Sequence, residues 1–152
     1  MSAPKTKHTK YIFEKAKHYC AYQERSVFEV KNKLYLWKVR PEVARKIIKS
    51  LEEENYLNEE RFARVFAGGK FRIKKWGRNK IIAGLRAKKI SDPIIQVGLD
   101  EIDEYQYEKT LQEVIEKKKS SMDDPKSFNN RNKIYNFVLS RGYEKHLILK
   151  YL

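Results

Sequence analysis

The chain has a single cysteine, only four prolines and six glycines among its 152 residues. One cysteine, Cys20, excludes an intrachain disulfide and fits a reducing compartment. Scarce proline and glycine leave few helix-breaking positions, and abundant Lys, Glu, Leu and Ile favour helices. No apolar run approaches the roughly 18 residues of a membrane-spanning helix, and residues 1–10 lack the apolar centre of a signal peptide. We therefore expect a cytoplasmic protein that does not enter a membrane.

Sequence motifs of the common enzyme classes are missing as well. The three histidines are far apart, and the sequence contains no His-x-x-Glu-His motif and no cysteine pair. The stretch AGGK at 67–70 lacks the spacing of a phosphate-binding loop and lies within a helical pattern. We interpret the acidic clusters at 52–54 and 123–124 as a helix end and a loop. The sequence therefore predicts no catalytic residue, no metal ligand and no cofactor, and a protein that is not an enzyme.

Positive charge is the dominant feature of what remains. Lys and Arg number 34 against 20 Asp and Glu, which gives a formal net charge of +14. Such a surface attracts polyanions, whether nucleic acid, an anionic membrane or an acidic protein face. The densest part lies between residues 70 and 89, where no acidic residue separates the basic ones. The candidate binding residues are Lys70, Arg72, Lys74, Lys75, Arg78, Lys80, Arg86, Lys88 and Lys89.

Apolar residues recur at helical spacing along almost the whole chain, and the alternation typical of strands is absent. Two shifted copies of one pattern follow each other: Leu34 aligns with Leu85 at a shift of 51, and Leu85 with Val138 at a shift of 53. The sequence therefore predicts an all-α fold of three tandem three-helix repeats of about 50 residues. We expect an elongated, curved array with one continuous interior, because each repeat alone is small for a core. The predicted segments are a flexible basic arm at 1–9 and repeats at 10–53, 54–102 and 103–152.

Local signals place several helix ends. The first helix is expected to start at Tyr11, after the arm. Ser26 and Asn58 are predicted N-caps, and Pro41 is predicted to open a helix, where its missing N–H costs least. The pair at 68–69, Gly-Gly, is interpreted as close packing or a bend within a helix.

The basic segment contains features with two interpretations. Trp76 could stack on exposed bases or fill a junction between repeats, and the sequence leaves both open. Opposite the apolar side of the predicted helix at 78–89, Ala83, Gly84 and Ala87 form a small-residue face that could admit a partner closely. The cations themselves could simply be a solvated face that keeps the protein soluble. A cluster of nine like charges repels itself, which favours a partner that relieves the repulsion.

Three stretches resemble a known family. YLNEERFARVF at 56–66, WGRNKIIAGLRAKKI at 76–90 and ERSVFEVKNKL at 24–34 are similar, in order and spacing, to motifs of the RecX family of bacterial RecA regulators. The usual paired Asp is Asn58-Glu59 here, which should still cap a helix. Lys89 replaces the usual glycine before Ile90, so the tightness of that turn stays open. The motif positions, interpreted as mainly structural, are Tyr56, Leu57, Asn58, Arg61, Phe62, Ala63, Gly77 and Leu85.

The resemblance implies a regulator of recombination, DNA repair and the SOS response. Family members bind RecA filaments on single-stranded DNA, lie along the filament groove, and restrain strand exchange and ATP hydrolysis. The expected partner is therefore the RecA filament, with single-stranded or double-stranded DNA left open, no membrane, and a monomeric chain.

Two alternatives stay in view. The chain could be a helical DNA-binding protein acting without RecA, with residues 77–89 as a recognition helix. It could also bind an anionic membrane surface, which is disfavoured because no predicted helix has a large exposed apolar face.

Overall fold

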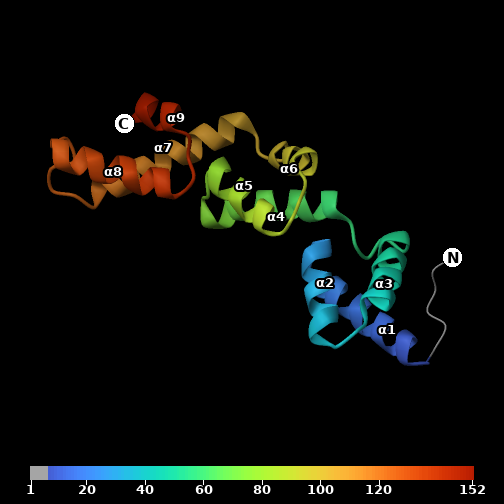
Figure 1. Ribbon diagram of the computed structural model, residues 1–152. Coiled ribbons are helices and arrows are strands. Elements are labelled where there is room, and N and C mark those ends of the chain that lie inside the picture. The colour runs from blue at the N-terminus through green and yellow to red at the C-terminus, as the bar shows by residue number, and fades with distance from the viewer. Residues whose placement is uncertain (1–6) are drawn as a thin grey trace.

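The computed structural model describes residues 7–152, and these form nine α-helices and no strand (Figure 1). The all-α prediction is therefore confirmed. The helices are α1 (Lys7–Tyr22), α2 (Val27–Leu36), α3 (Pro41–Glu53), α4 (Glu59–Lys74), α5 (Arg78–Ala87), α6 (Asp92–Leu99), α7 (Glu104–Ser120), α8 (Phe128–Ser140) and α9 (Lys145–Tyr151).

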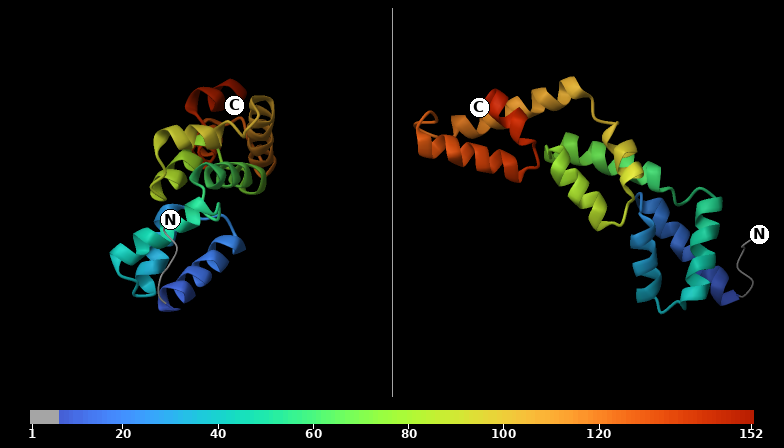
Figure 2. Two further views of the ribbon diagram at one scale, coloured as in Figure 1. Left: turned by 90° about the vertical axis from the view of Figure 1, so that its right-hand side faces the viewer. Right: turned by 45° about the horizontal axis from the view of Figure 1, so that its top comes forward.

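The helices form three groups that follow one another along an elongated array (Figures 1 and 2). We call them the first unit (α1–α3), the second unit (α4–α6) and the third unit (α7–α9). The first and third units lie at opposite ends, and the second lies between them (Figure 1). No helix within residues 7–152 is long and apolar enough to cross a membrane.

The N-terminal prediction needs a correction. Residues 1–6 of the expected arm lie outside the described residues. Helix α1 begins at Lys7, not at Tyr11, so the predicted arm extends too far. Lys7 and His8 are exposed. Because helical backbone bonds are internal, a helix can continue beyond its buried stripe without any apolar signal in the sequence.

The predicted starts of α2, α3 and α4 agree with the structure. Ser26 forms a capping box, accepting from the Glu29 N–H while its own N–H donates to the Glu29 carboxylate. Asn58 Oδ1 accepts from the Arg61 N–H at 2.9 Å, and Pro41 stands at the first turn of α3. Helix α4 runs through the Gly-Gly pair at 68–69 without a break.

The internal repeat is visible in backbone conformation. Lys38, Lys89 and Gly142 occupy equivalent positions after α2, α5 and α8, and all three have positive φ, at 62°, 61° and 100°. Lys89 therefore adopts the left-handed backbone conformation that glycine favours. The equivalent core positions Leu34, Leu85 and Val138 are all fully buried.

The prediction of one continuous hydrophobic interior is wrong. The first unit has its own hydrophobic cluster, while the second and third units share another. Around the first cluster, the partly buried rings of Tyr19, Trp37 and Tyr56 cover the core edge. Bulky aromatic side chains bury a large apolar area each, which lets a small unit close its core without a neighbour.

The second and third units meet through backbone and aromatic contacts. The Gly77 N–H donates to the Arg141 carbonyl at 2.7 Å, and the Tyr143 hydroxyl donates to the Lys75 carbonyl at 2.8 Å. The ring of Tyr107 lies 5.3 Å from that of Tyr143, centroid to centroid. This junction is an extension of the core.

The first and second units meet through polar groups instead. The Arg61 guanidinium donates to the Glu24 carboxylate at 2.8 Å, and the Val27 N–H donates to a Glu59 carboxylate oxygen at 3.1 Å. A further pair from the second unit, described below, reaches α2. The two junctions are therefore different in kind.

Candidate functional site

The basic segment predicted from the sequence covers the end of α4, the following turn, α5 and the turn after it. Within residues 7–152, three of its cations form ion pairs with carboxylates: Arg78, Arg86 and Lys88. For the other six, no described carboxylate oxygen lies within 4.0 Å. The segment therefore divides into three cations that are paired within the chain and six, called available below, that have no such partner among the described residues.

Arg78 belongs to the fold. Its guanidinium lies 3.8 Å from the centre of the Tyr107 ring, donates to Glu144 at 2.8 Å and also pairs with Glu104. Its backbone N–H donates to the Tyr107 hydroxyl at 3.0 Å, and that hydroxyl donates to Glu144. The side chain is held at the junction of the second and third units, with its charge compensated within the chain.

The same network fixes protonation states. Burial, reinforced by the hydrogen bond to Glu144, raises the pKa of Tyr107 above its ordinary value. Burial works against the charge of Arg78, but the hydrogen bond and attraction from Glu144 outweigh it and raise the Arg78 pKa. The tyrosine therefore stays a donor and the arginine stays charged at neutral pH.

The other two paired cations, Lys88 and Arg86, differ in how much their ion pairs contribute to the fold. Lys88 Nζ lies 3.0 Å from a Glu29 carboxylate oxygen, so it bridges the second unit to α2 of the first. Arg86 and Asp92 are 3.4 Å apart, and both side chains are well exposed. An exposed pair of that kind contributes about 0–1 kcal/mol. Arg86 therefore remains more accessible than Lys88.

Among the six available cations, two lie over one aromatic ring. The ammonium groups of Lys70 and Lys80 are 4.9 Å and 4.8 Å from the centre of the Trp76 ring. Lys89 Nζ lies 5.8 Å from the ring centre of Phe28 in α2. The remaining three, Arg72, Lys74 and Lys75, are exposed at the end of α4.

The structure favours packing over base stacking for Trp76. The ring packs edge-on against Phe66 at 6.3 Å and borders the core shared by the second and third units. The small-residue face of α5 is also occupied, because a Cβ at Gly84 would approach the Phe66 ring to 2.8 Å. The idea that this face admits a partner is therefore wrong at Gly84, since the chain's own Phe66 fills the space.

The family motif positions have structural surroundings. The apolar ones, Leu57, Phe62, Ala63 and Leu85, are buried, and Tyr56 packs beside the first core. Asn58 caps α4, as described above. Arg61 joins the first and second units through Glu24 and also donates to the Asn55 carbonyl at 3.0 Å. Gly77 lies at the backbone contact with the third unit.

A second group of cations was missed by the sequence analysis. A groove of ≈ 250 Å³ lies where the third unit meets the end of α4, and no described residue that lines it is acidic. Lys118 and Arg141 lie over the Phe137 ring at 4.6 Å and 4.9 Å. The three consecutive lysines at 117–119 are the feature of the sequence that could have indicated this group. The basic residues lining the groove are Lys75, Lys117, Lys118 and Arg141.

The described residues offer little for catalysis. Within 7–152 no group of three or more His, Cys, Asp or Glu side chains could hold a metal ion. Cys20 is buried, and burial raises the pKa of its thiol to about 11, so it is not a thiolate at neutral pH. The arrangement can bind anions and present charge, which is the chemistry of a binding surface.

Comparison with protein families identifies matches to two consecutive parts of the chain. Residues 13–51 match the first three-helix domain of RecX, and residues 58–99 match the second. The matched ranges correspond to most of the first and second units.

Curated relatives agree with the family matches. A regulatory protein RecX of Lactobacillus johnsonii is 37% identical over 92 residues, which cover 60% of this chain and 34% of that protein. One of Clostridium perfringens (strain 13 / Type A) is 30% identical over 118 residues, 76% of this chain and 55% of that protein. The matches thus cover about a third to about half of the length of these relatives.

Solved structures share the fold. The crystal structure of RecX from Lactobacillus salivarius superposes with a TM-score of 0.83 at 22% identity, covering 93% of this chain and 92% of that one. A second crystal structure, of a regulatory protein RecX, gives a TM-score of 0.86 at 15% identity over 94% of this chain and 72% of that one.

Proposed function

The chain belongs to the RecX family of regulatory proteins, and from this premise we propose that it binds RecA and the filament that RecA forms on single-stranded DNA. There it modulates ATP hydrolysis and strand exchange, and so acts in recombination, DNA repair and the SOS response. It does so in the cytoplasm, as a monomer and without catalysis of its own.

One observation carries the proposal. Cations without a carboxylate partner among the described residues continue from the end of α4 across the junction into the third unit. Lys75, at the end of α4, belongs both to the basic segment at 70–89 and to the groove at the third unit. Because no described carboxylate lies within 4.0 Å of them, their charge attracts an anionic partner more strongly than the charge of a paired cation would. The core shared by the two units holds these cations at fixed spacing. A repeating nucleoprotein filament offers anionic groups at regular intervals to such a surface.

Regulation follows from binding several subunits at once. An elongated array can contact neighbouring filament subunits, and linked modest contacts add up through effective concentration. A bound protein that prefers one arrangement of neighbouring subunits shifts the filament toward that arrangement. Nucleotide-linked changes in the filament then become harder, and ATP hydrolysis falls.

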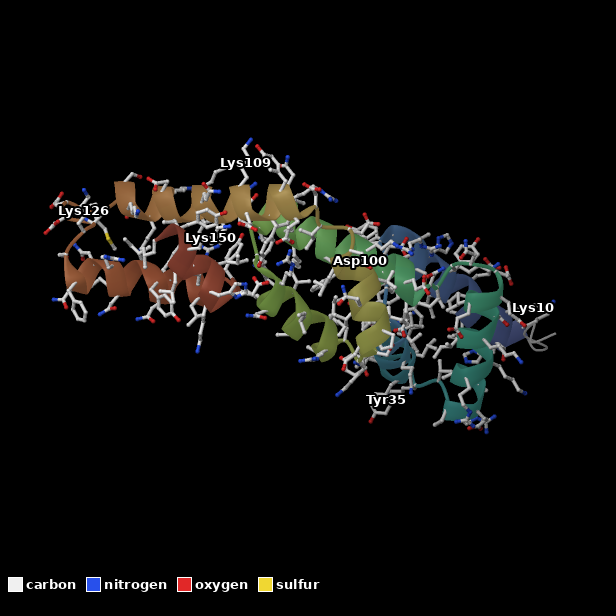
Figure 3. The ribbon with its side chains drawn as sticks, turned by 90° about the horizontal axis from the view of Figure 1, so that it is seen from above. Lys10, Tyr35, Asp100, Lys109, Lys126 and Lys150 are labelled. Carbon is white, nitrogen blue, oxygen red and sulfur yellow. The ribbon has the colours of Figure 1, made fainter. Side chains whose placement is uncertain are left out.

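The test uses two triple charge reversals that change net charge equally. The site triple is Lys74→Glu, Lys75→Glu and Lys117→Glu; the control triple is Lys31→Glu, Lys109→Glu and Lys126→Glu, all at exposed positions. Lys109 and Lys126 lie on α7 and the loop after it, as Figure 3 indicates. RecA-driven ATP hydrolysis on excess single-stranded DNA is measured as each protein is added.

We expect wild type and the control triple to inhibit alike, and the site triple to need at least about tenfold more protein, since several charge contacts are lost. Circular dichroism checks that each variant is helical. Equal inhibition by both triples would refute the site, and a wild-type protein without effect on RecA would refute the function.

Direct DNA binding without RecA is the competing function. Inhibition that spare single-stranded DNA relieves would support it, because simple competition for DNA then explains the loss of hydrolysis. The role of α5 as a recognition helix is weakened by its contacts, since Arg78 is paired internally and Lys80 lies over Trp76. Few long polar side chains of α5 are left for base readout.

A further inference from the structure

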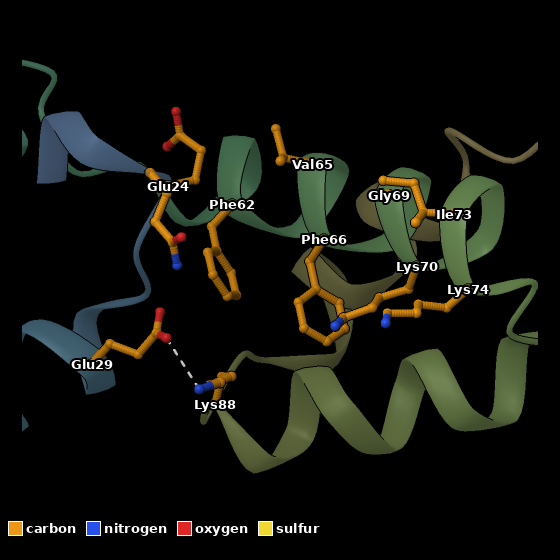
Figure 4. Close-up of a pocket in the computed structure, with 11 residues that line it drawn as sticks. Glu24, Glu29, Phe62, Val65, Phe66, Gly69, Lys70, Ile73, Lys74 and Lys88 are labelled. Atoms are coloured by element: carbon orange, nitrogen blue, oxygen red, sulfur yellow. Dashed lines mark hydrogen bonds and ion pairs between the residues drawn. The ribbon is translucent and has the colours of Figure 1, made fainter.

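An open groove of ≈ 540 Å³ lies between the first and second units (Figure 4). One side of α4 forms its floor, and the loop between α1 and α2 and the start of α2 contribute its far wall through Glu24 and Glu29. The groove shares no lining residue with the cationic groove at the third unit. Of the family motif positions, only Phe62 lines it, and that side chain is buried, so the exposed apolar side chains of the floor have no role assigned so far.

The floor has a regular shape. Val65, Gly69 and Ile73 are spaced four residues apart, so they follow one another along one face of α4 (Figure 4). Val65 is 54% exposed and Ile73 is 77% exposed. A Cβ placed at Gly69 would meet nothing within 4 Å. Two aliphatic side chains thus flank an empty position, which is the shape that accepts one inserted apolar side chain.

At the rim of the groove, the acidic side chains are paired within the chain and two lysines are not. Glu24 is engaged by Arg61 at 2.8 Å, and Glu29 by Lys88 at 3.0 Å, so both acids of the wall are compensated. Lys70 and Lys74 also line the groove, and among the described residues neither has a carboxylate within 4.0 Å. An occupant that complements this rim carries negative charge beside its apolar group.

The floor suits a protein segment better than a nucleic acid strand. Bases bind through aromatic stacking platforms, whereas the exposed groups here are aliphatic. Two aromatic rings also line the groove, but Phe62 is buried and Phe66 is partly buried against the core. The Lys70 ammonium lies 5.4 Å from the Phe66 ring centre and 4.9 Å from that of the neighbouring Trp76. Phosphates gain nothing from the side chains of Val65 and Ile73, which an apolar side chain would remove from water.

We infer that this groove docks an acidic, apolar-anchored segment of the filament's protein component. An aliphatic or aromatic side chain inserts at Gly69 between Val65 and Ile73, and carboxylates beside it pair with Lys70 and Lys74. The inference rests on the proposed function, because the partner is the protein subunit of the filament. Since the walls come from two units, the occupant also fixes the first unit against the second.

The binding test compares Ile73→Glu with Leu149→Glu. Leu149 on α9 is a matched control, an aliphatic residue that is 64% exposed and far from the groove. Co-sedimentation measures binding to RecA filaments on single-stranded DNA, and fluorescence anisotropy measures binding to that DNA alone. We expect Ile73→Glu to weaken filament binding at least about tenfold and to leave DNA binding unchanged, while Leu149→Glu changes neither.

A crosslinking test identifies the occupant directly. Cys20 is buried, so Ile73→Cys adds one accessible thiol, which is labelled with a benzophenone maleimide. Irradiation in the filament should join the label to the protein subunit, and the same label at Leu149→Cys should give far less product. A product with DNA, or with a second copy of this chain, would overturn the inference and assign the groove to that occupant.

The failures are distinguishable. If wild type does not bind filaments at all, the proposed function and the groove both fail. If wild type binds and Ile73→Glu binds equally well, the groove inference alone fails. Loss of DNA binding by Ile73→Glu without filament present would also sink it, because the floor would then serve nucleic acid.

Discussion

Replacing Gly77 with alanine should destabilise the protein strongly. Gly77 has φ −80°, a conformation open to any residue, so backbone strain is not the reason. The reason is space: a Cβ there would lie 2.4 Å from the Gly142 carbonyl carbon and from the Tyr143 nitrogen. These are backbone atoms of the third unit and cannot rotate away. The methyl group must push the third unit off the second.

The expected loss can be assembled from the contacts. Separation breaks the hydrogen bonds from Gly77 N–H to the Arg141 carbonyl, 2.7 Å, and from Asn79 N–H to the Gly142 carbonyl, 2.9 Å. At about 0.5–1.5 kcal/mol for each bond and about 1–3 kcal/mol for overpacking, the free energy of unfolding falls by about 2–6 kcal/mol. That is a large share of the about 5–15 kcal/mol typical of a folded protein.

The assay is urea unfolding followed by circular dichroism, with Gly69→Ala as the control. Gly69 lies inside α4 with open space at its Cβ position, so alanine should raise stability there by about 0.5–1 kcal/mol. Opposite shifts of the unfolding midpoint are therefore expected from the same chemical change. A Gly77→Ala protein as stable as wild type would refute the backbone contact as the basis of the second junction.

Three further predictions follow from single positions. Lys38→Gly should raise the free energy of unfolding by about 0.5–1 kcal/mol, because lysine at φ 62° is strained; a lower urea midpoint would contradict this. The free energy of unfolding should fall as pH rises from 9 to about 11, because burial raises the pKa of the Cys20 thiol and the unfolded thiol therefore loses its proton at lower pH than the folded one. Cys20→Ala should reduce this dependence of the free energy of unfolding on pH, and an unchanged dependence would contradict the prediction. Added salt should speed hydrogen exchange of the Val27 amide, because salt screens the charged Glu59 that accepts from it, and should leave the Gly77 amide protected, because its acceptor is a backbone carbonyl. Equal responses of the two amides, measured by NMR, would contradict the conclusion that the two junctions differ in kind.

The fold was largely predictable because its signals are local. Helical periodicity, N-cap residues and the repeated apolar positions each depend on residues within a few turns of one another. Leu34, Leu85 and Val138 are fully buried, as their alignment indicated. The separate core of the first unit was not predictable in this way, because whether Trp37 and Tyr19 close a core depends on how three helices pack.

The candidate site was predictable only in part, because pairing is a property of the folded chain. Arg78 finds its carboxylates at Glu104 and Glu144, 26 and 66 residues away. The density of basic residues between 70 and 89 could not separate it from Lys74 or Lys75, which have no such partner among the described residues.

Charge counting also concealed the cations of the third unit. Several acids there are engaged elsewhere: Glu144 holds Arg78, and Glu108 pairs with Lys150 at 3.1 Å. The near balance of basic and acidic residues in this part of the sequence therefore hides Lys117 and Lys118, which form no ion pair with a carboxylate of residues 7–152.

The difference between the two junctions bears on how the protein could act on a filament. The second and third units form one packed body, so the cations on it keep their spacing, and binding through several contacts weakens when spacing varies. The first unit is attached through polar contacts such as the ion pair of Arg61 with Glu24, and its hydrophobic cluster is separate from that of the other two units, so its attachment is the weaker one. The groove with Ile73 lies at that weaker attachment. A partner segment bound there adds contacts to both sides, so it converts two bodies into one and makes binding of the first unit depend on binding of the rest.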